Sequence, residues 1–484
     1  MTTALPAPCD ESLGFQAAEQ DCTHKTGVLV ATIAGSSLAF VMGSIVNVAL
    51  PSMQAEFATD AQGAQWIINS YLLPVGALIL LGGALGDKYG RKLMFQTGLI
   101  LFTLATLACA FAPNLDLLLA MRAIQGIGAA LLAPNSLAII STSFSESERG
   151  KAIGTWAGMG AFAGAIAPVI GGWAIDLANW RWAFAIIIPL AIIALVIGQR
   201  AITENRDRET DGYPLDWTGA VLVTIGLGLL VWTLTVLPDG TTPDGAKWLS
   251  GGLAISAIIL FLLVEKRKND KAMVPLHLFN TASFAGISML TLFLYAALGG
   301  LLVLLPFMLI NAGGYTATET GFAILPFPLT MALLSRYAGG LSDRFGVRTI
   351  LTIGPAIVAA GFFYFSLLSG TEINYWRDIL PALMIIALGM TASVAPLTTA
   401  VMASVDDRHG GTASGINNAI SRSAGLIATA LLGFVLVGDD SGNGALVAGF
   451  ASAAWVGALL ALVSAIAAWF LIRLKTTPKK QPAS

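Results

Sequence analysis

Two stretches of this apolar sequence are versions of one polar loop: Gly83-Ala84-Leu85-Gly86-Asp87-Lys88-Tyr89-Gly90-Arg91-Lys92 and Gly339-Gly340-Leu341-Ser342-Asp343-Arg344-Phe345-Gly346-Val347-Arg348. Their aspartates, at positions 87 and 343, are 256 residues apart. A second pair of related stretches, Gly150-Lys151-Ala152-Ile153-Gly154 and Gly411-Thr412-Ala413-Ser414-Gly415, repeats at an interval of 261 residues. The chain therefore contains two copies of one structural unit.

The rest of the sequence is strongly apolar. Of its 484 residues, 56% are hydrophobic and 11% are charged, whereas a soluble protein carries about 25% charged residues. The apolar residues are gathered in blocks of about 20 or more, long enough for a helix to cross a bilayer core of about 30 Å. Irregular backbone cannot face lipid. The composition therefore predicts an all-α integral membrane protein.

Fourteen apolar blocks can be counted, and no polar stretch between them is long enough for a soluble domain. They cover residues 26–50, 64–86, 93–112, 115–140, 151–175, 180–199, 215–236, 247–264, 281–310, 318–341, 348–369, 378–402, 412–437 and 444–473. The interval between the two copies spans eight blocks, which predicts six helices, two inserted helices and six more. Parallel repeats related by an axis along the membrane normal are a transporter design, with the substrate site between the halves near the midplane.

This organisation predicts five segments along the chain. They are a disordered cytoplasmic tail (1–25), a first six-helix bundle (26–200), a two-helix insertion with its flanking inner loops (201–275), a second six-helix bundle (276–474) and a short cytoplasmic tail (475–484). The first tail lacks a basic start followed by an apolar core, so it is not a secretory signal.

The distribution of lysine and arginine predicts the orientation in the membrane. With the amino terminus inside, 20 of the 26 basic residues fall in inner segments, three lie in outer loops (Arg181, Lys247, Arg377) and three lie within spans (Arg122, Arg336, Arg422). Cytoplasmic loops retain basic residues. We therefore expect a multi-pass protein of the cytoplasmic (inner) membrane with both termini in the cytoplasm. The tryptophans expected at the outer interface are Trp66, Trp173, Trp180, Trp182, Trp248 and Trp376.

Charge and residue spacing exclude several classes of function. The net charge of −2 argues against a nucleic-acid partner, which calls for a concentrated basic surface. The three cysteines (Cys9, Cys22, Cys109) form no disulfide framework, and no His, Cys or carboxylate cluster has metal-ligand spacing. We expect neither a metal nor a cofactor. No catalytic constellation lies within the spans, so an enzyme is not expected, and a sensor would need a soluble output domain.

Several motifs resemble one known family. The loop 83–92 resembles the inner-loop signature of the major facilitator superfamily, and Arg122-Ala-Ile-Gln125-Gly126-Ile-Gly128 resembles its second motif. Fourteen spans narrow the resemblance to the fourteen-helix drug/proton antiporters, together with further motifs that lie in the same order. These are the helix-five antiporter motif (Gly160, Gly164, Pro168, Gly171, Gly172), Asn47 to Pro51, Trp180 to Phe184 and Gly321 to Pro326. The resemblance covers residues 26–475.

Three positions depart from that pattern. Many members carry a carboxylate a few residues before the Asn47 motif, where this chain reads Val41-Met42-Gly43-Ser44. Ala167 replaces a usual glycine before Pro168, and Ile187 stands where an asparagine is common. The first departure weakens the case for a proton-coupled exporter of cations, because no Asp or Glu lies deep in any predicted span.

Polar residues within the spans are the candidates for a substrate cavity. A guanidinium in a membrane is costly and faces protein or water. Two interpretations of Arg122 and Arg422 stay open: they line a central cavity and bind substrate, or they lock helices together through polar neighbours. Arg336 is close enough to a span end to reach the interface. The other candidates are Asn47, Tyr71, Gln125 and Asn418. The cavity is expected between the first, second, fourth and fifth spans and their repeat partners.

The duplicated loops predict a conformational gate. An aspartate at the carboxyl end of a helix is favourable if it faces the amino end of another helix. The resemblance implies that Asp87 faces the start of the thirteenth span at Gly411, and by the repeat Asp343 faces Lys151. Both contacts are expected when the inner side is closed. Arg91 and Arg348 belong to the same loops, and the helix-five motif is expected to pack and bend.

The leading functional expectation is a secondary active transporter. It exports lipophilic or amphipathic small molecules by alternating access and proton antiport, with protons, the bilayer and a small-molecule substrate as partners and accessory efflux subunits left open. The alternative is an exporter or importer of an organic anion or metabolite, favoured by the arginines within the spans and the missing carboxylate.

Overall fold

A computed structural model describes residues 15–204, 215–238, 240, 242–269, 272–369, 373–406, 410–433 and 443–473. In these residues the regular structure is helical. The first half comprises α1 (Phe15–Glu56), α2 (Ala61–Tyr89), α3 (Arg91–Ala110), α4 (Leu115–Ser143), α5 (Glu146–Leu177), α6 (Trp180–Ala185) and α7 (Ile188–Ala201). The insertion comprises α8 (Trp217–Val236) and α9 (Asp244–Lys268).

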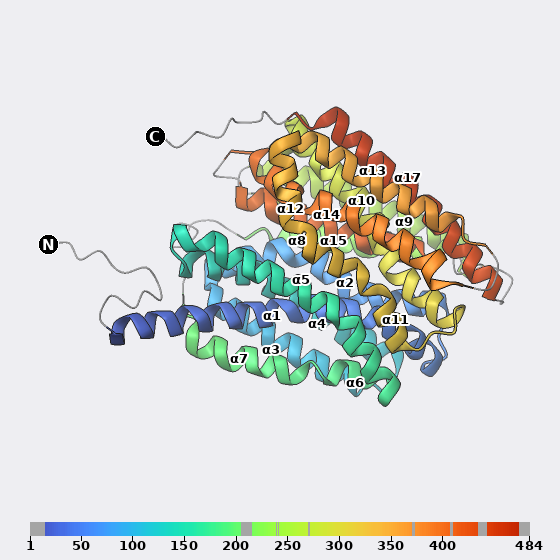
Figure 1. The fold of residues 1–484 in the computed structure, drawn as a ribbon, viewed down its shortest axis with the longest axis horizontal. Coiled ribbons are helices and arrows are strands. Elements are labelled where there is room, and N and C mark those ends of the chain that lie inside the picture. Colours follow the sequence, from blue (N-terminus) through green and yellow to red (C-terminus); the bar gives the residue numbers. More distant parts are fainter. Residues whose placement is uncertain are drawn as a thin grey trace.

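The second half begins with a short 3-10 helix and ends near the carboxyl terminus. It comprises η3 (Leu276–Asn280), α10 (Ala282–Asn311), α11 (Ala317–Ile324), α12 (Pro326–Phe345), α13 (Val347–Ser366), the π-helical turn η4 (Tyr375–Ile379), α14 (Leu380–Ala403), α15 (Gly410–Leu431) and α17 (Asn443–Leu471). Helix α1 begins and α17 ends on the same side of the bundle (Figure 1). We call this the inner side and the opposite one the outer side.

The predicted fourteen membrane crossings are confirmed. Thirteen helical segments of the described chain are long and apolar enough to span a bilayer. The fourteenth is α15, whose 22 residues are long enough for about 33 Å of helix. Its hydropathy is lowered by polar residues, Asn417, Asn418, Ser421 and Arg422. Two crossings are each made of two helices, α6 with α7 and α11 with α12, and Pro189 and Pro326 lie in the first turns of the second members.

The duplicated loops have the same backbone conformation. Gly90 and Gly346 each lie between two consecutive helices with a positive φ, +117° and +85°. Their N–H groups close the preceding helices by donating to Gly86 O and Ser342 O. A positive φ favours glycine because it has no Cβ, which explains why both copies carry glycine at this place.

The helix crossings also repeat. Helices α3 and α4 cross at Gly98 and Gly128, where a Cβ on Gly98 would lie 2.8 Å from Gly128 O. Helices α13 and α14 cross at Gly354 and Gly389, where a Cβ on Gly354 would lie 3.0 Å from Gly389 O. Such close approach is possible only without side chains. The positions correspond at the same two intervals as the loops, so the fold is the predicted 6 + 2 + 6 arrangement with a pseudo-twofold repeat.

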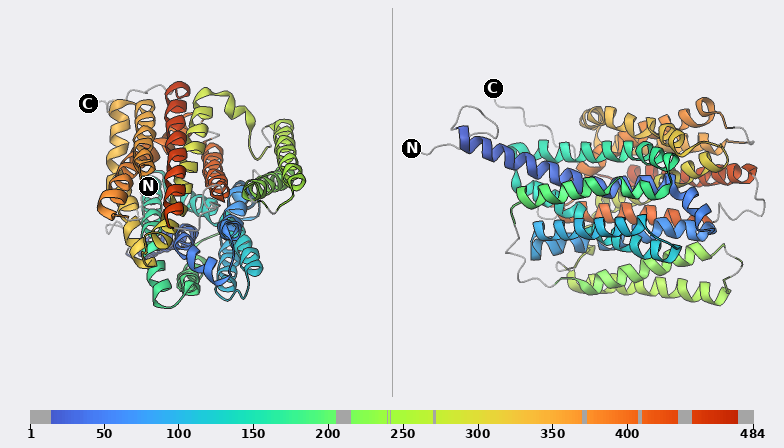
Figure 2. Two further views of the ribbon diagram at one scale, coloured as in Figure 1. Left: turned by 90° about the vertical axis from the view of Figure 1, so that its right-hand side faces the viewer. Right: turned by 90° about the horizontal axis from the view of Figure 1, so that it is seen from below.

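The inserted helices lie beside the two bundles. Helices α8 and α9 pack against each other, and α8 alone makes extensive contact with the bundles, through α2 and α15. Both views in Figure 2 show the pair at the edge of the molecule. Ala77, Leu227, Val231, Leu426 and Ala430 form a small buried cluster at this junction. Helix α8 therefore makes most of the insertion's contacts with the bundles, and α9 adds a small contact with η3.

Two details differ from the sequence predictions. The disordered tail predicted for residues 1–25 is wrong from Phe15 onward, because α1 continues to that residue; residues 1–14 and 475–484 lie outside the described chain. Trp180 does not face an interface. It is buried between Phe57 and Phe184. Its indole donates to Glu56, 2.7 Å away, because the carboxylate at the end of α1 provides an acceptor for the N–H of the buried ring.

Candidate substrate cavity

A cavity of about 300 Å³ lies between the two halves. Its lining comes from α1, α2, α4, α5, α10 and α15 and is mostly apolar and aromatic. The polar groups that reach it include Ser44, Asn47, Tyr71, Arg122, Tyr295, Ser421, Arg422 and Thr429. Of the expected lining helices, α12 and α14 contribute none of these residues, because they pack chiefly against each other and against α13 and α5. Among the residues that the structure describes, the lining includes two arginines and no carboxylate.

Arg122 lines the cavity but is fully engaged with the protein. Only 1% of the residue is exposed. Its Nε donates to Ile67 O at 3.1 Å and its Nη1 donates to Gln125 Oε1 at 2.6 Å. The guanidinium also lies over the Tyr71 ring, 4.4 Å from the centroid. Arg122 therefore lines the cavity and also joins α4 to α2, and substrate binding by Arg122 stays a prediction.

Gln125 is a positioning residue and does not contact the cavity. It is completely buried, and its Nε2 donates to Thr106 Oγ1 at 2.7 Å while its oxygen accepts from Arg122. The expectation that Gln125 lines the cavity is wrong. A helical spacing of three residues places it beside Arg122, but α3 covers it from outside.

Asn47 and Tyr71 line the cavity with their polar atoms already paired. Asn47 Nδ2 donates to Leu302 O at 3.0 Å, which joins α1 to α10 across the two halves. The Tyr71 hydroxyl donates to Ala39 O at 3.0 Å. These hydrogen bonds hold α1 to α10 and α2 to α1 at the cavity wall.

Arg422 is the less engaged of the two cavity arginines. Its guanidinium lies over the Phe40 ring, 5.2 Å from the centroid, and its buried Nε has no hydrogen-bond partner among the described residues. An unpaired guanidinium donor is costly to bury. Arg422 is therefore a candidate binding residue at the cavity wall.

Asn418 does not line the cavity, which corrects that expectation. Its neighbour Asn417 accepts a hydrogen bond from Thr291 Oγ1 at 2.6 Å and joins α15 to α10. The cavity face of α15 is formed by Ser421, Arg422, Gly425 and Thr429. These positions are spaced at helical intervals of one, three and four residues. Asn418, four residues before Arg422, shares this face but lies one turn before the lining residues.

The residues of the helix-five motif contact two different regions, the cavity and the outer end of the other half. Gly160 and Gly164 line the cavity beside Phe40. Nearer the outer end, a Cβ on Gly171 would lie 2.8 Å from the Ile45 side chain. A Cβ on Gly172 would lie 2.3 Å from Ala317 O, and Pro168 O lies against Gly321. The outer part of the motif thus packs directly on α11 of the other half.

A charge completes this outer contact. Asp176 accepts hydrogen bonds from the N–H groups of Ala317 and Thr318, at 3.1 and 2.7 Å. These groups are at the amino end of α11, where an anion is favoured. Sequence reasoning missed Asp176; the signal available was an acid just beyond the fifth span and the capping box of Thr316 and Glu319. The outer side is closed here.

The inner side is open between α5 and α12. Cβ atoms on Gly150, Gly154 and Gly158 would meet no atom within 4 Å. Figure 1 shows α5 and α12 diverging toward the side where α1 begins. The cavity is therefore approached from the inner side in this conformation.

The predicted gate contacts belong to the opposite conformation and stay predictions. Asp87 pairs with Arg91 of its own loop at 2.8 Å, and a Cβ on Gly411 would meet nothing within 4 Å. Lys151 is exposed, and Arg348 Nε donates to Trp469 O within the second half. The side chains of Asp343 and Arg336 lie outside the described part.

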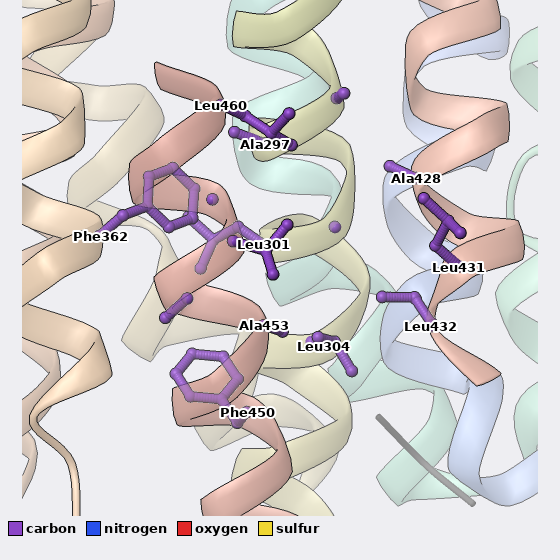
Figure 3. Close-up of a pocket in the computed structure, with 15 residues that line it drawn as sticks. Ala297, Leu301, Leu304, Phe362, Ala428, Leu431, Leu432, Phe450, Ala453 and Leu460 are labelled. Atoms are coloured by element: carbon purple, nitrogen blue, oxygen red, sulfur yellow. The ribbon is translucent and has the colours of Figure 1, made fainter. Parts of the chain in front are cut away.

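A second cavity, of about 400 Å³, lies within the second half (Figure 3). It uses other faces of α10 and α15, together with α13 and α17, and its lining consists of Ala, Gly, Leu, Val and Phe residues, including Leu301, Phe362 and Phe450. No polar side chain orients a ligand there. The central cavity is therefore the candidate site.

Two six-helix repeats around a central cavity define a transporter of the major facilitator type. The family model described as Major Facilitator Superfamily matches residues 32–429, and the chain belongs to this family. It is a multi-pass membrane protein and a transporter of small molecules rather than an enzyme. The resemblance inferred from the motifs is confirmed.

Named relatives include drug resistance proteins. The multidrug resistance protein Stp of Mycobacterium tuberculosis is 31% identical over 409 residues, which cover 84% of this chain and 75% of that protein. The puromycin resistance protein pur8 of Streptomyces alboniger is 31% identical, covering 94% and 93%. A crystal structure of a D-xylose-proton symporter has a TM-score of 0.66 with 15% identity, covering 92% and 97%, and shows the shared fold.

Proposed function

We propose that this protein exports lipophilic or amphipathic small molecules across the cytoplasmic membrane by alternating access and proton antiport. The main observation behind this proposal is the cavity between the two halves, whose aromatic and apolar lining is reached from the inner side. The resistance proteins among its relatives support export of toxic small molecules. Both termini lie in the cytoplasm in this proposal, which follows the lysine and arginine bias. The segment boundaries 26–200, 201–275 and 276–474 belong to the same proposal.

The electrostatics of the cavity favour neutral or anionic substrates. Arg122 and Arg422 line it, and no carboxylate in the described part of the chain does. A cation would enter such a cavity without a counter-charge, and a desolvated cation beside two arginines is strongly disfavoured. The free Arg422 Nε specifically supports the second candidate function, transport of an organic anion or metabolite.

Proton coupling has to use a group outside this cavity lining. Asp87 is the proposed participant, as a gate rather than as a proton carrier, because it lies at the inner end of α2 and pairs with Arg91 in the open conformation. Accessory efflux subunits stay proposed partners, and co-purification from native membranes tests them.

Transport by the purified protein in proteoliposomes tests the proposal. Three amphipathic probes of similar size are compared, one cationic, one neutral and one anionic, with and without an imposed pH gradient. We expect gradient-driven movement of the neutral or anionic probe and its loss with a protonophore. Movement of the cation alone would contradict the electrostatic argument, and movement unaffected by the gradient would contradict proton antiport.

A further inference from the structure

Two carboxyl groups meet at the inner base of the inserted helices, away from the cavity. Asp216 caps the amino end of α8, and Glu265 lies in the last turn of α9. Asp216 is 7% exposed and Glu265 is completely buried. Neither lines the central cavity, so the transport route does not account for them.

Asp216 is surrounded by donors. Its Oδ1 accepts from the Gly219 N–H at 2.7 Å and from the Lys268 ammonium group, and its Oδ2 faces the Met273 N–H at 3.4 Å. Burial raises the pKa of Asp216, but the hydrogen bonds from Lys268, Glu265 and Gly219 outweigh it and lower the pKa below the usual value. Asp216 therefore carries the negative charge of the pair.

Glu265 has one satisfied and one unsatisfied oxygen. Its Oε2 accepts from the Val274 N–H at 2.5 Å, whereas its buried Oε1 has no donor among the described residues. Oε1 and the Asp216 carboxylate both lie against Gly219, 2.4 and 2.9 Å from the position that a Cβ would take there, so the two carboxyl groups are direct neighbours. Two carboxylates offer acceptors only. A proton on Glu265 satisfies Oε1 and turns the contact into a donated hydrogen bond.

We propose that Asp216 and Glu265 form a proton-binding site that fastens the inserted helices to the second half of the transporter. The Met273 and Val274 N–H groups that contact the pair lie just before η3 and α10. Among the described residues, Asp216 and Lys268 are the charged groups that act on Glu265, and η3 contributes one titratable side chain, His277.

Loss of the proton changes the balance of charges. Two buried carboxylates then face each other, with Lys268 as the neighbouring cation among the described residues. Like charges in contact disfavour ionisation. The repulsion separates the carboxyl groups and frees the segment before η3. Because that segment leads directly into α10, which lines the cavity, inner pH is connected to the second half through the insertion.

Infrared spectroscopy of the full-length protein in lipid tests the site without a transport assay. At about pH 7, we expect a protonated carboxyl C=O band in the native protein and its loss in Glu265→Gln. Asp216→Asn is expected to remove the band too, because its amide donates to Glu265 and Lys268 becomes the partner of the Glu265 carboxylate. Glu204→Gln is the matched control, since Glu204 accepts the Lys92 and Leu93 N–H groups in an exposed inner loop.

A native band that persists in Glu265→Gln would overturn the proposal, as would a band lost equally in Glu204→Gln. A spin label at Ala272 provides the second measurement. We expect its mobility to rise between about pH 7 and about pH 9.5 in the native chain and to stay constant in Glu265→Gln, which keeps a donor at this position. The same rise in both proteins would contradict a proton-dependent fastening.

Discussion

The two cavity arginines have the same chemistry and different uses. Arg122 donates to Ile67 O and Gln125 and stacks on Tyr71, so its charge holds α4 to α2. Arg422 faces Phe40 with its Nε unpaired. Removing one partner of a buried hydrogen bond leaves the other partner unsatisfied. Removing a donor that is already unpaired leaves no such unsatisfied group.

Substitution of each arginine by glutamine is therefore expected to separate stability from transport. Arg122→Gln loses about 1–3 kcal/mol of folding stability, measured by thermal unfolding in detergent. Arg422→Gln keeps the native unfolding temperature and loses transport of the anionic probe by tenfold or more, equivalent to about 1.4 kcal/mol. Arg422→Lys is the control for charge alone. An Arg422→Gln variant with native transport would remove Arg422 from the binding site.

Asp216 predicts how stability depends on acid. Its pKa is held below the usual value by hydrogen bonds, so its contribution is present above the ordinary pKa of about 3.9 and is lost as the pH falls through the lower folded-state pKa. We expect Asp216→Asn to weaken the acid dependence of the unfolding temperature. Asp244→Asn is the control, because that side chain is 87% exposed. Identical acid dependence in the native protein and Asp216→Asn would contradict this assignment.

At the level of helices, α5 is divided between two tasks. Its middle lines the cavity, where a Cβ on Gly164 would have 3.7 Å of space to Phe40. Its outer part touches α11, where a Cβ on Gly172 would lie 2.3 Å from Ala317 O. Backbone cannot move away as cheaply as a flexible side chain, so the second contact tolerates no added atom.

Gly172→Ala is accordingly expected to weaken the outer closure and shift the population toward outward-open molecules. Spin-label distances between the outer ends of α5 and α11 measure that shift. Gly164→Ala is the matched control from the same helix and is expected to keep the native distances. Unchanged distances in Gly172→Ala would show that this contact does not hold the outer side closed.

Asp176 supplies the charged part of the same closure. Asp176→Asn keeps the size of the side chain and loses the interaction between a full negative charge and the amino end of α11, worth about 0.3–2 kcal/mol. We expect a smaller shift of the same spin-label distances in the same direction. Glu319→Gln, which retains a capping side chain at the same helix, is the control. A shift as large in that control would assign the effect to capping and not to charge.

For the whole molecule, the repeat supports one conformational cycle for both halves. The loops at Gly90 and Gly346 and the crossings at Gly98 and Gly354 match at a constant interval, so the halves are rigid units of similar construction. Asp176 contacts α11 on the closed outer side. On the inner side, the partner of Asp87 among the described residues is Arg91 of its own loop. We propose that Asp87 gains a new partner, the amino end of α15, when the inner side closes.

Asp87→Asn is expected to slow transport strongly and to enrich inward-open molecules, because the anion that meets the amino end of α15 is lost. Spin labels at the inner ends of α2 and α15 measure the populations. Asp116→Asn, at the outer start of α4, is the control. Native transport and native populations in Asp87→Asn would contradict a gate formed by Asp87 and the amino end of α15.

Much of the molecule was predictable from local patterns. Hydropathy located the spans, with α15 still recognisable as a block from 412 to 437 despite Arg422, and the spacing of like loops revealed the repeat. Membrane helices obey these rules because the bilayer sets their length and satisfies no backbone polar group. The site was predictable only in outline: Arg122, Arg422, Asn47 and Tyr71 line the cavity, whereas Gln125 and Asn418 do not.

The sequence by itself determined the number of crossings, the duplication and the residue types that meet the membrane, because each depends on neighbours along the chain. Tertiary structure alone decided which arginine is already paired, where Asp176 finds the start of α11, and how Asp216 meets Glu265 across 49 residues of chain. Hydrogen bonds act over about 3 Å. Which groups come within that distance depends on how helices far apart in sequence pack, and no local pattern encodes it.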